Sequence, residues 1–527
     1  MIAVLLAGAL QALCFAPGPL PAWSLPFVQI ASLSVLAAHT FKARNARQAA
    51  GRGWLFGLAQ FTVGVYWLTI SMHQYGGLPL ALAIGALLLF AAAMALYAAA
   101  ACALCAWLCA GCAQPEQRAG RQILNALAWA GAWTLFEWLR GTLWTGFPWL
   151  NAGYAHAEGM FAAWAPLIGV YGVAWLSAFA AGSIALMIRA KDTAYDRSAA
   201  STIALTLATG LIGIAMAHIE WSRPQGDPLL VRLVQPATPQ DSKFDPAALA
   251  ATQRHLLQLA GLAAKSPANP PALIVLPETV MPAMQDRLPP EIWQPWLDLA
   301  RQTQAGILLG LPLHTRRDGR DRYTNSATLI LPGDQQPPLA PGRWHYDKHH
   351  LVPFGEFIPP GFRWFVQAMR IPLGDFDAGG LGQAPFRLGG QRFAINICYE
   401  DAFGEEIATA VARPEDSAGI LVNLSNLAWF GDTWALRQHL WISRLRALET
   451  ARPIIRATNT GMTAAIDPHG EIRGMLDPGR PGVLDVEIQG TTGLTPYVRW
   501  GNGPVLLWLA LGLLLAFRSR KRCSKAA

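Results

Sequence analysis

Apolar stretches dominate the first 218 residues and the C-terminal end of this 527-residue chain. A helix that crosses a lipid bilayer needs about 20 mostly apolar residues, with a lower limit of about 17. By that measure the first and last stretches are at the short limit, and an α-helical bundle of about eight transmembrane helices is predicted. The spans are expected near residues 2–15, 24–40, 54–72, 79–110, 123–139, 161–188, 201–218 and 501–517.

A stretch with the ordinary polarity of a soluble protein lies between these apolar blocks. Only 14% of the whole chain is charged, whereas soluble proteins average about a quarter. Asp, Glu, Lys and Arg are nevertheless spread throughout residues 219–500. We therefore expect three parts: a membrane domain of about seven helices over 1–218, a folded domain over 219–500, and a helix with a basic tail over 501–527.

Lys and Arg are distributed unequally between the two sets of loops that eight spans would create. They gather in the loops and the tail at 42–52, 118–121, 189–197 and 518–525. In the opposite loops Arg140 is the one such residue. Positive loops stay in the cytoplasm, so both chain ends are expected there and residues 219–500 outside. The net charge of +8 is largely this bias and gives no reason to expect a nucleic acid partner.

Residues 219–500 alternate between apolar, β-branched runs and helical patterns. Mostly apolar strands with helices between them indicate sheets that helices bury on their faces. Asp432 is a plausible N-cap for the last of these helices. The predicted strands are 229–235, 272–277, 306–311, 327–331, 393–398, 419–424 and 453–458, and the predicted helices are 245–265, 291–304, 404–413 and 433–451.

Of the seven cysteines, Cys398 alone falls in the domain expected outside the membrane. An oxidising compartment favours paired cysteines, so an unpaired one is either a free reactive thiol or a small buried apolar side chain. Cys398 and Glu278 each stand where an apolar strand ends, and Lys348 lies in the polar segment W-H-Y-D-K-H-H. Strand ends beside loops are where α/β folds collect reactive groups. The three could form a nucleophile set, or they could be unrelated.

Three short blocks carry a resemblance to a known family. P-E-T at 277–279, K-H-H-L-V-P-F-G-E at 348–356 and N-I-C-Y-E-D at 396–401 resemble the signature blocks of the carbon–nitrogen hydrolase (nitrilase) superfamily. With seven spans before and one after, the chain resembles the apolipoprotein N-acyltransferase family of bacterial inner membranes. The resemblance implies a multi-pass protein whose α-β-β-α sandwich faces the periplasm. Further similar blocks stand at 423–431, 457–461 and 495–501.

The same resemblance implies a role for each matching residue. Cys398 would be the nucleophile, Glu278 the general base and acid, and Lys348 the cation that stabilises the oxyanion. The family often has Trp where this chain has Phe244 and Leu276. Supporting or substrate-contacting roles would belong to Glu356, Tyr399, Glu400, Phe244 and Trp429. Without the resemblance, an ordinary ion pair would explain Glu356 and routine packing would explain Tyr399.

The implied reaction is an acyl transfer in two steps. A fatty acyl chain would pass from a phospholipid to a thioester on Cys398, and then to the α-amino group of the N-terminal S-diacylglyceryl-cysteine of an apolipoprotein. The partners would be the phospholipid donor, the diacylated apolipoprotein and the lipid bilayer. No cofactor and no metal are expected.

The sequence is compatible with three other interpretations. A membrane-tethered amidase of the same superfamily would use water as the acceptor and would need a wet, polar pocket. A transporter would have charged residues inside its spans. In this chain, Glu137 and Arg140 near the end of one span are nearly the only such residues. A metal site would need a fourth ligand besides the three neighbouring histidines His345, His349 and His350.

Overall fold

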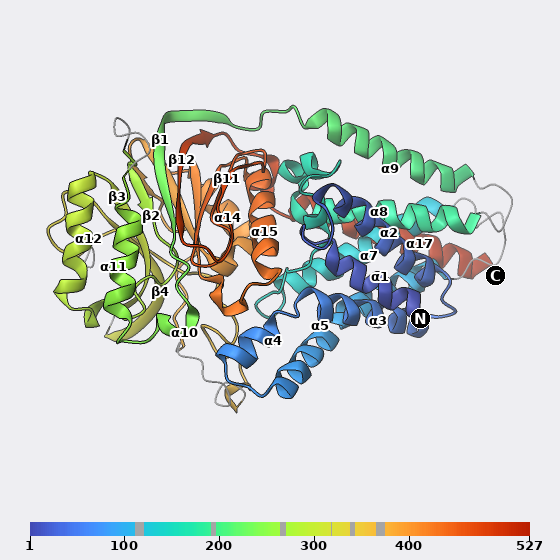
Figure 1. Cartoon of the computed structure of the whole chain (residues 1–527). Coiled ribbons are helices and arrows are strands. Elements are labelled where there is room, and N and C mark those ends of the chain that lie inside the picture. Colours follow the sequence, from blue (N-terminus) through green and yellow to red (C-terminus); the bar gives the residue numbers. More distant parts are fainter. Residues whose placement is uncertain are drawn as a thin grey trace. The chain divides into compact units, whose positions relative to one another are not determined.

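The chain forms two compact units in the computed structural model, which describes residues 1–110, 121–190, 197–263, 270–317, 319–337, 343–364 and 375–526. One unit is helical and comprises Met1–Tyr66, Ala81–Glu220 and Arg499–Ala527. The other contains the β-sheets and comprises Trp67–Leu80 and Trp221–Val498. Figure 1 shows the elements of both.

Each apolar range identified in the sequence contains a helix of the first unit. Within the described residues, four helices are long and apolar enough to cross a membrane, or five if α3 and the segment Leu68–Tyr75, bent by 61° from it, count as one span. The predicted count of about eight spans is therefore not confirmed. The helices are α1 (Ile2–Leu13), α2 (Leu25–Phe41), α3 (Ala46–Gly64), α5 (Leu80–Cys109), α7 (Gln122–Thr142), α8 (Ala165–Ala190), α9 (Arg197–Met216) and α17 (Gly503–Ala526).

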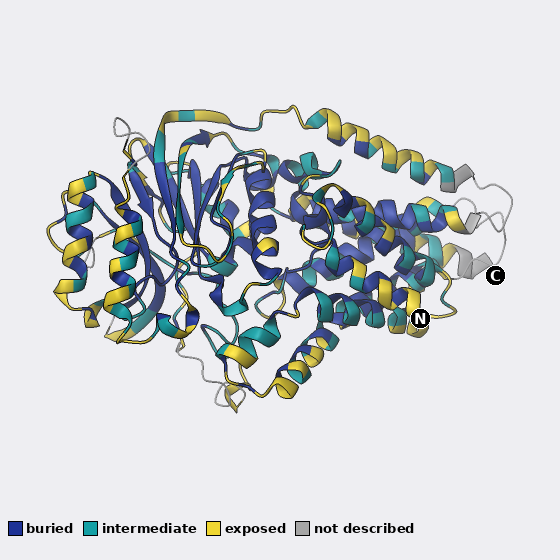
Figure 2. Ribbon diagram, viewed as in Figure 1, coloured by how far each residue is buried: buried dark blue, intermediate teal, exposed yellow. Residues whose placement is uncertain are grey.

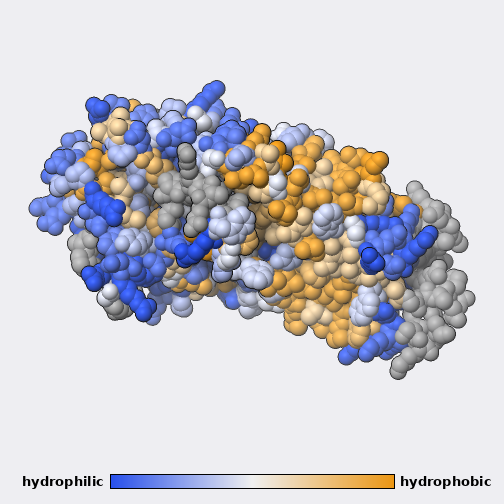
Figure 3. Space-filling view, turned by 90° about the horizontal axis from the view of Figure 1, so that it is seen from below, coloured by the Kyte–Doolittle hydropathy of each residue, from blue (hydrophilic) through white to orange (hydrophobic). Residues whose placement is uncertain are grey.

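Small residues let these helices approach one another closely. A Cβ at Gly57 of α3 would lie 2.7 Å from the Cα of Ala95 in α5, so a glycine is required there. Transmembrane helices pack through such contacts because lipid is as apolar as their own side chains. Apolar side chains also gather on the outer surface of this unit, as Figure 3 shows. Among the exposed ones are Leu82, Leu89, Leu207, Leu211, Leu507 and Leu515.

Two six-stranded sheets form the second unit. The first has the strand order β12-β1-β2-β3-β4-β5 and the second has β11-β10-β9-β8-β7-β6. The first sheet contains β1 (Arg223–Gln235), β2 (Leu273–Val275), β3 (Gly306–Arg317), β4 (Arg320–Ile330), β5 (His345–Asp347) and β12 (Gly482–Thr492). The second contains β6 (Phe386–Leu388), β7 (Gln391–Ile397), β8 (Ile420–Ser425), β9 (Ile454–Thr458), β10 (Ala464–Ile466) and β11 (Ile472–Met475).

The two sheets pack face to face, and helices cover their outer faces. Side chains from both sheets, among them Leu233, Leu308, Ile395 and Val422, form one buried cluster. A second cluster joins the first sheet to α11 (Leu249–Ala260) and α12 (Pro290–Thr303), and a third joins the second sheet to α14 (Gly404–Val411) and α15 (Ala435–Thr450). Figure 2 shows the strands buried, with exposed outer faces on α11 and α12 and mostly buried residues along α15. The expected α-β-β-α sandwich is confirmed.

Two details differ from the sequence expectations. Helix α15 begins at Ala435 with Trp434 at the N-cap and no side-chain cap, so the prediction that Asp432 caps it is wrong. The predicted span 54–72 is broken, because α3 ends at Gly64 and the chain then bends. The following segment belongs to the sandwich unit, where the indole Nε1 of Trp67 donates to Gln438 Oε1 at 3.0 Å.

Candidate functional site

Cys398 stands at the point where the chain leaves β7. The strand ends at Ile397, and Cys398 begins the 3-10 turn Cys398–Ala402 with a φ of 52°. This left-handed conformation is uncommon for any residue other than glycine and persists only where surrounding contacts hold it. The carbonyl of Cys398 accepts hydrogen bonds from His439 Nε2 at 3.0 Å and from Asn423 Nδ2 at 3.3 Å. Cys398 is therefore a cysteine on a sharp turn whose thiol forms no disulfide.

Glu278 follows β2 and is buried beneath neighbouring strands. Its Oε1 accepts from Asn325 Nδ2 at 2.7 Å, and its Oε2 accepts from the backbone N–H of Asn426 at 2.8 Å. Gly310 of β3 makes this position possible, since a Cβ there would lie 2.7 Å from the Cα of Glu278. The carboxylate is thus held in one place by a donor on β4 and a donor directly after β8.

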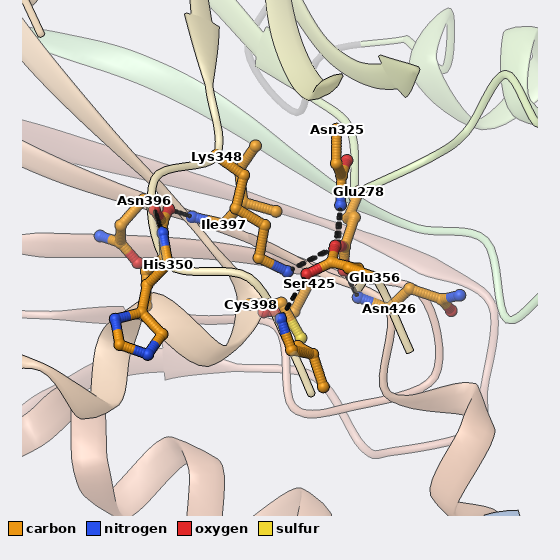
Figure 4. Close-up of polar contacts among 12 residues, drawn as sticks. Glu278, Asn325, Lys348, His350, Glu356, Asn396, Ile397, Cys398, Ser425 and Asn426 are labelled. Atoms are coloured by element: carbon orange, nitrogen blue, oxygen red, sulfur yellow. Dashed lines mark hydrogen bonds and ion pairs between the residues drawn. The ribbon is translucent and has the colours of Figure 1, made fainter. Parts of the chain in front are cut away.

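Lys348 follows β5 and brings a positive charge to the same place. Its Nζ lies 2.9 Å from Glu356 Oε1 and 3.5 Å from Glu278 Oε1, and the side chain is only 1% exposed. Figure 4 shows these three side chains pointing toward one another, with Cys398 beside them. The structure therefore brings Glu278, Lys348, Glu356 and Cys398 together, although up to 120 residues separate them in the sequence.

Asn325 joins the two carboxylates and was not singled out from the sequence. Its Nδ2 donates both to Glu278 Oε1 at 2.7 Å and to Glu356 Oε1 at 2.6 Å. Its backbone carbonyl accepts from the N–H of Lys348 at 2.8 Å. An amide donor between two carboxylates offsets their mutual repulsion, so Asn325 sets the spacing of the acidic groups. The one signal in the sequence is the polar run Y-T-N-S directly before the apolar end of the strand, A-T-L-I.

Glu400 ties the segment that carries Lys348 to the turn that carries Cys398. One oxygen accepts from the backbone N–H of His349 at 2.7 Å, and the other accepts from that of Ile397 at 2.5 Å. The hydroxyl of Tyr346 adds a third donor at 2.9 Å. Burial raises the pKa of Glu400 to about 7, against the opposing effect of these N–H donors and of Lys348.

The remaining aromatic candidates each pack against another aromatic ring. The ring of Tyr399 lies 5.8 Å from that of His350 and 5.1 Å from that of Phe403. Phe244 and Trp429 contact each other, with 6.2 Å between their ring centres. Their contact joins the loop after α10 (Gln240–Lys243) to the turn Leu427–Phe430.

Charges inside the site act on the thiol in opposite directions. Burial and then the negative charge of Glu278 raise the pKa of the Cys398 thiol, while Lys348 lowers it. Burial lowers the pKa of Lys348, but the carboxylates of Glu356 and Glu278 outweigh burial and raise it overall. Both shifts favour a neutral thiol beside a charged ammonium ion. That combination requires a base to generate the nucleophile.

A second lysine, also missed in the sequence, lies next to Glu278. Lys243 is buried and its Nζ donates to the backbone carbonyl of Glu278 at 3.2 Å. Burial lowers its pKa to about 8, in spite of the charges of Glu278 and Cys398. No sequence pattern distinguishes this lysine from an ordinary surface lysine.

The three histidines considered as metal ligands have separate partners. His349 Nδ1 donates to the carbonyl of Gly379 at 2.9 Å, and His350 Nδ1 pairs with Glu406 Oε1 at 2.8 Å. In the described part of the chain, no group of three or more His, Cys, Asp or Glu side chains could hold a metal ion.

Two family models match the chain. The apolipoprotein N-acyltransferase N-terminal domain matches residues 7–183, and the carbon-nitrogen hydrolase family matches residues 230–497. Among solved structures, an amidase from Nesterenkonia sp. is 17% identical, with 53% of this chain and 96% of that chain covered and a TM-score of 0.36. A CN-hydrolase superfamily protein from Xanthomonas campestris is 20% identical, with 53% and 97% covered and a TM-score of 0.36.

Curated relatives extend over nearly the whole chain. An apolipoprotein N-acyltransferase of Bordetella bronchiseptica is 48% identical over 98% of this chain and 96% of its own length. One of Ralstonia nicotianae is 43% identical over 99% and 94%, and one of Nitrosomonas europaea is 38% identical over 94% and 94%. The chain therefore belongs to the apolipoprotein N-acyltransferase family.

Proposed function

We propose that this protein transfers a fatty acyl chain from a phospholipid to the α-amino group of the N-terminal S-diacylglyceryl-cysteine of apolipoproteins, through a thioester on Cys398. The observation that carries the proposal is the buried cluster of Glu278, Lys348 and Glu356 beside that cysteine. It supplies a base, a cation and a nucleophile in a chain of this family.

The first half-reaction forms the acyl-enzyme. The carboxylate of Glu278 takes the thiol proton, and the sulfur of Cys398 attacks the ester carbonyl of the phospholipid. Lys348 and a backbone N–H beside Cys398 stabilise the oxyanion; losing one such donor typically costs about 3–4 kcal/mol. Glu278 then returns the proton to the departing lysophospholipid alkoxide, which leaves a thioester on Cys398 and an ionised Glu278.

The second half-reaction transfers the acyl group to the acceptor. An N-terminal amine has an ordinary pKa of about 7.7–8.0, so a useful fraction is neutral at physiological pH. This amine attacks the thioester carbonyl while Glu278 accepts its proton. Collapse of the intermediate expels the sulfur of Cys398, which recovers a proton from Glu278. The products are an amide on the apolipoprotein and the free enzyme.

Both substrates carry acyl chains, which accounts for a membrane scaffold. We place the protein in the bacterial inner membrane as a multi-pass protein with both ends in the cytoplasm. The sandwich domain would face the periplasm. The unequal distribution of Lys and Arg between the loops supports this orientation.

The test uses the full-length protein in phospholipid vesicles. Intact-mass measurement should find an acyl adduct that hydroxylamine removes, and adding a diacylated lipopeptide should transfer the acyl group to the peptide amine. Cys398→Ala should form no adduct, and Cys398→Ser at most an ester. The matched control is Cys109→Ala, a free cysteine of the helical unit, which should behave like native protein. An adduct on Cys398→Ala, or free fatty acid in place of acylated peptide, would overturn the proposal.

A further inference from the structure

A second buried polar cluster touches the nucleophile on its backbone side. It consists of His439 and Ser443 on α15, Arg456 on β9 and Asp401 in the turn that Cys398 begins. His439 is 1% exposed and the other three are fully buried. None of them has a role in the two half-reactions, although burying such charges is expensive unless they are paired.

The contacts of His439 fix which ring nitrogen carries its hydrogen. A carbonyl oxygen can only accept, so Nε2, at 3.0 Å from the carbonyl of Cys398, must be the donor. Arg456 Nη2 contacts Nδ1, and a guanidinium can only donate, so Nδ1 must be the acceptor. The ring is therefore a neutral imidazole in one tautomer. Burial and then the positive charge of Arg456 lower the pKa of His439 well below its usual range, which agrees with the neutral form.

Arg456 is itself held on two sides. Its Nη1 donates to the backbone carbonyl of His439 at 2.9 Å and lies 3.2 Å from Asp401 Oδ2. Ser443 contacts both Asp401 and Arg456. Because Asp401 and Cys398 belong to the same turn, the cluster holds that turn at two points.

Because the peptide bond after Cys398 is rigid, holding the Cys398 carbonyl also fixes the orientation of the Tyr399 N–H. The described chain contains no cis peptide, so the Cys398–Tyr399 unit is planar and trans, and the N–H of Tyr399 points opposite to the carbonyl of Cys398. His439 and Asn423 hold that carbonyl. Holding the carbonyl therefore also sets the direction of the N–H next to the nucleophile.

We propose that His439, held in one tautomer by Arg456, is a positioning residue that aims the backbone N–H of Tyr399 at the oxyanion formed during acyl transfer. The inference rests on the proposed function, because it needs a tetrahedral intermediate on Cys398. In this role the His439–Arg456 pair does not touch the substrate and acts only through the backbone of Cys398.

Two substitutions separate the two hydrogen bonds of His439. In His439→Asn the amide replaces Nδ1, so Arg456 keeps a partner while the bond to the carbonyl of Cys398 is lost. In His439→Gln the amide reaches the position of Nε2 and can still donate to that carbonyl. Both are measured as full-length protein in phospholipid vesicles, after thermal unfolding has established that they fold.

Two reactions of Cys398 are then compared. Acylation by phospholipid passes through an oxyanion, whereas alkylation by iodoacetamide is a direct displacement that forms none. We expect His439→Asn to lower the acylation rate by up to about 100-fold, because a group displaced by about 1 Å at an active site can cost that much. Its alkylation rate should stay close to native, and His439→Gln should recover most of the acylation rate.

The outcomes distinguish the two proposals. Native acylation in His439→Asn, or alkylation that falls in parallel with acylation, would overturn the positioning role. If His439→Asn does not fold, His439→Gln decides: near-native acylation supports the role, and acylation lost while alkylation stays native overturns it. If the native protein itself forms no adduct on Cys398, the proposed function fails instead.

Discussion

Lys348 and Glu356 form a buried ion pair, with 2.9 Å between Nζ and Oε1, and the ammonium lies farther, at 3.5 Å, from Glu278 Oε1. A buried cation needs a close partner, because removing one member of such a pair typically costs about 3–5 kcal/mol. Glu356 meets that need at the shorter distance. Glu278, which lies farther from the ammonium, is the group that the proposed mechanism uses as its base.

The first prediction concerns the different roles of Glu356 and Glu278. In Glu356→Gln, Lys348 loses its closest negative partner and should draw Glu278 closer than the present 3.5 Å. Glu278 is then bound more tightly to Lys348 and is less able to accept a proton. We therefore expect kcat to fall by about 100-fold or more, as when general acid–base catalysis is lost. The measurement is acyl transfer to a lipopeptide at saturating phospholipid. Glu415→Gln is the control, since its exposed charge should contribute little; a Glu356→Gln variant with native kcat would contradict the prediction.

The second prediction tests the close approach of β3 to Glu278. In Gly310→Ala the new Cβ would lie 2.7 Å from the Cα of Glu278 and 2.8 Å from the N of Thr279, so the backbone around the base must shift. Because a displacement of about 1 Å at an active site can cost about 100-fold in rate, we expect activity to fall that far while the sandwich stays folded.

Gly306→Ala on the same strand is the matched control. Its Cβ would meet only side-chain carbons, the nearest being Leu388 Cδ2 at 3.2 Å, and a side chain can move aside more easily than backbone. Activity and thermal unfolding of the two variants are compared side by side. Equal losses of activity in both would show that β3 does not set the position of Glu278.

The third prediction concerns the thiol. The negative charge of Glu278 is one cause of the raised pKa of Cys398, so Glu278→Gln should lower that pKa. The rate of alkylation by iodoacetamide, followed as pH is raised, should therefore reach its midpoint at lower pH than in native protein. Acyl transfer should nevertheless fall by about 100-fold or more, because the base is gone. A midpoint that moves to higher pH would show that Glu278 does not oppose ionisation of the thiol.

The fourth prediction concerns Lys243 and the pH dependence of stability. Burial lowers its pKa from 10.5 to about 8, so between these pH values the unfolded chain binds a proton that the folded protein has released. The free energy of unfolding of native protein therefore gains a contribution as pH rises through this window. The contribution amounts to about 3 kcal/mol at most, from 1.36 kcal/mol per pKa unit.

Lys243→Met lacks this contribution. The free energy of unfolding of Lys243→Met, relative to that of native protein, should be highest at about pH 7 and should decline toward about pH 10. Thermal unfolding of both proteins in the same detergent measures the difference at each pH. If the stability of Lys243→Met relative to native protein instead rises with pH, or does not change, burial does not lower the pKa of Lys243.

Local patterns predicted strands β1–β4 and β7–β9 of the sandwich but missed β5, β6, β10, β11 and β12. Each predicted strand from 229–235 to 453–458 overlaps an observed strand, because runs of β-branched and apolar residues report burial on both faces of a sheet. Local patterns were less reliable at element ends. The N-cap expected at Asp432 was wrong because the helix begins three residues later, at Ala435. Ends depend on a few contacts that periodicity does not record.

Residues whose importance comes from contacts alone were missed in the sequence. Asn325, Lys243 and His439 belong to no motif that was singled out, and each is polar and buried beside a reactive group. The left-handed backbone of Cys398 was equally invisible, since no pattern in the sequence records it. The grouping of Trp67–Leu80 with the sandwich unit also depends on a distant partner, Gln438.

The amino-acid sequence by itself determined the apolar helices, the layers of the sandwich and the identity of a thiol, an ammonium and two carboxylates as candidates. These follow from local composition and from short motifs, which neighbouring residues encode. Only the tertiary structure decided that Lys348 sits closer to Glu356 than to Glu278, that Asn325 joins the two carboxylates, and that His439 holds the backbone of Cys398. Hydrogen bonds and charge interactions act over a few ångströms, and residues far apart in sequence reach such distances only when the sheets have packed.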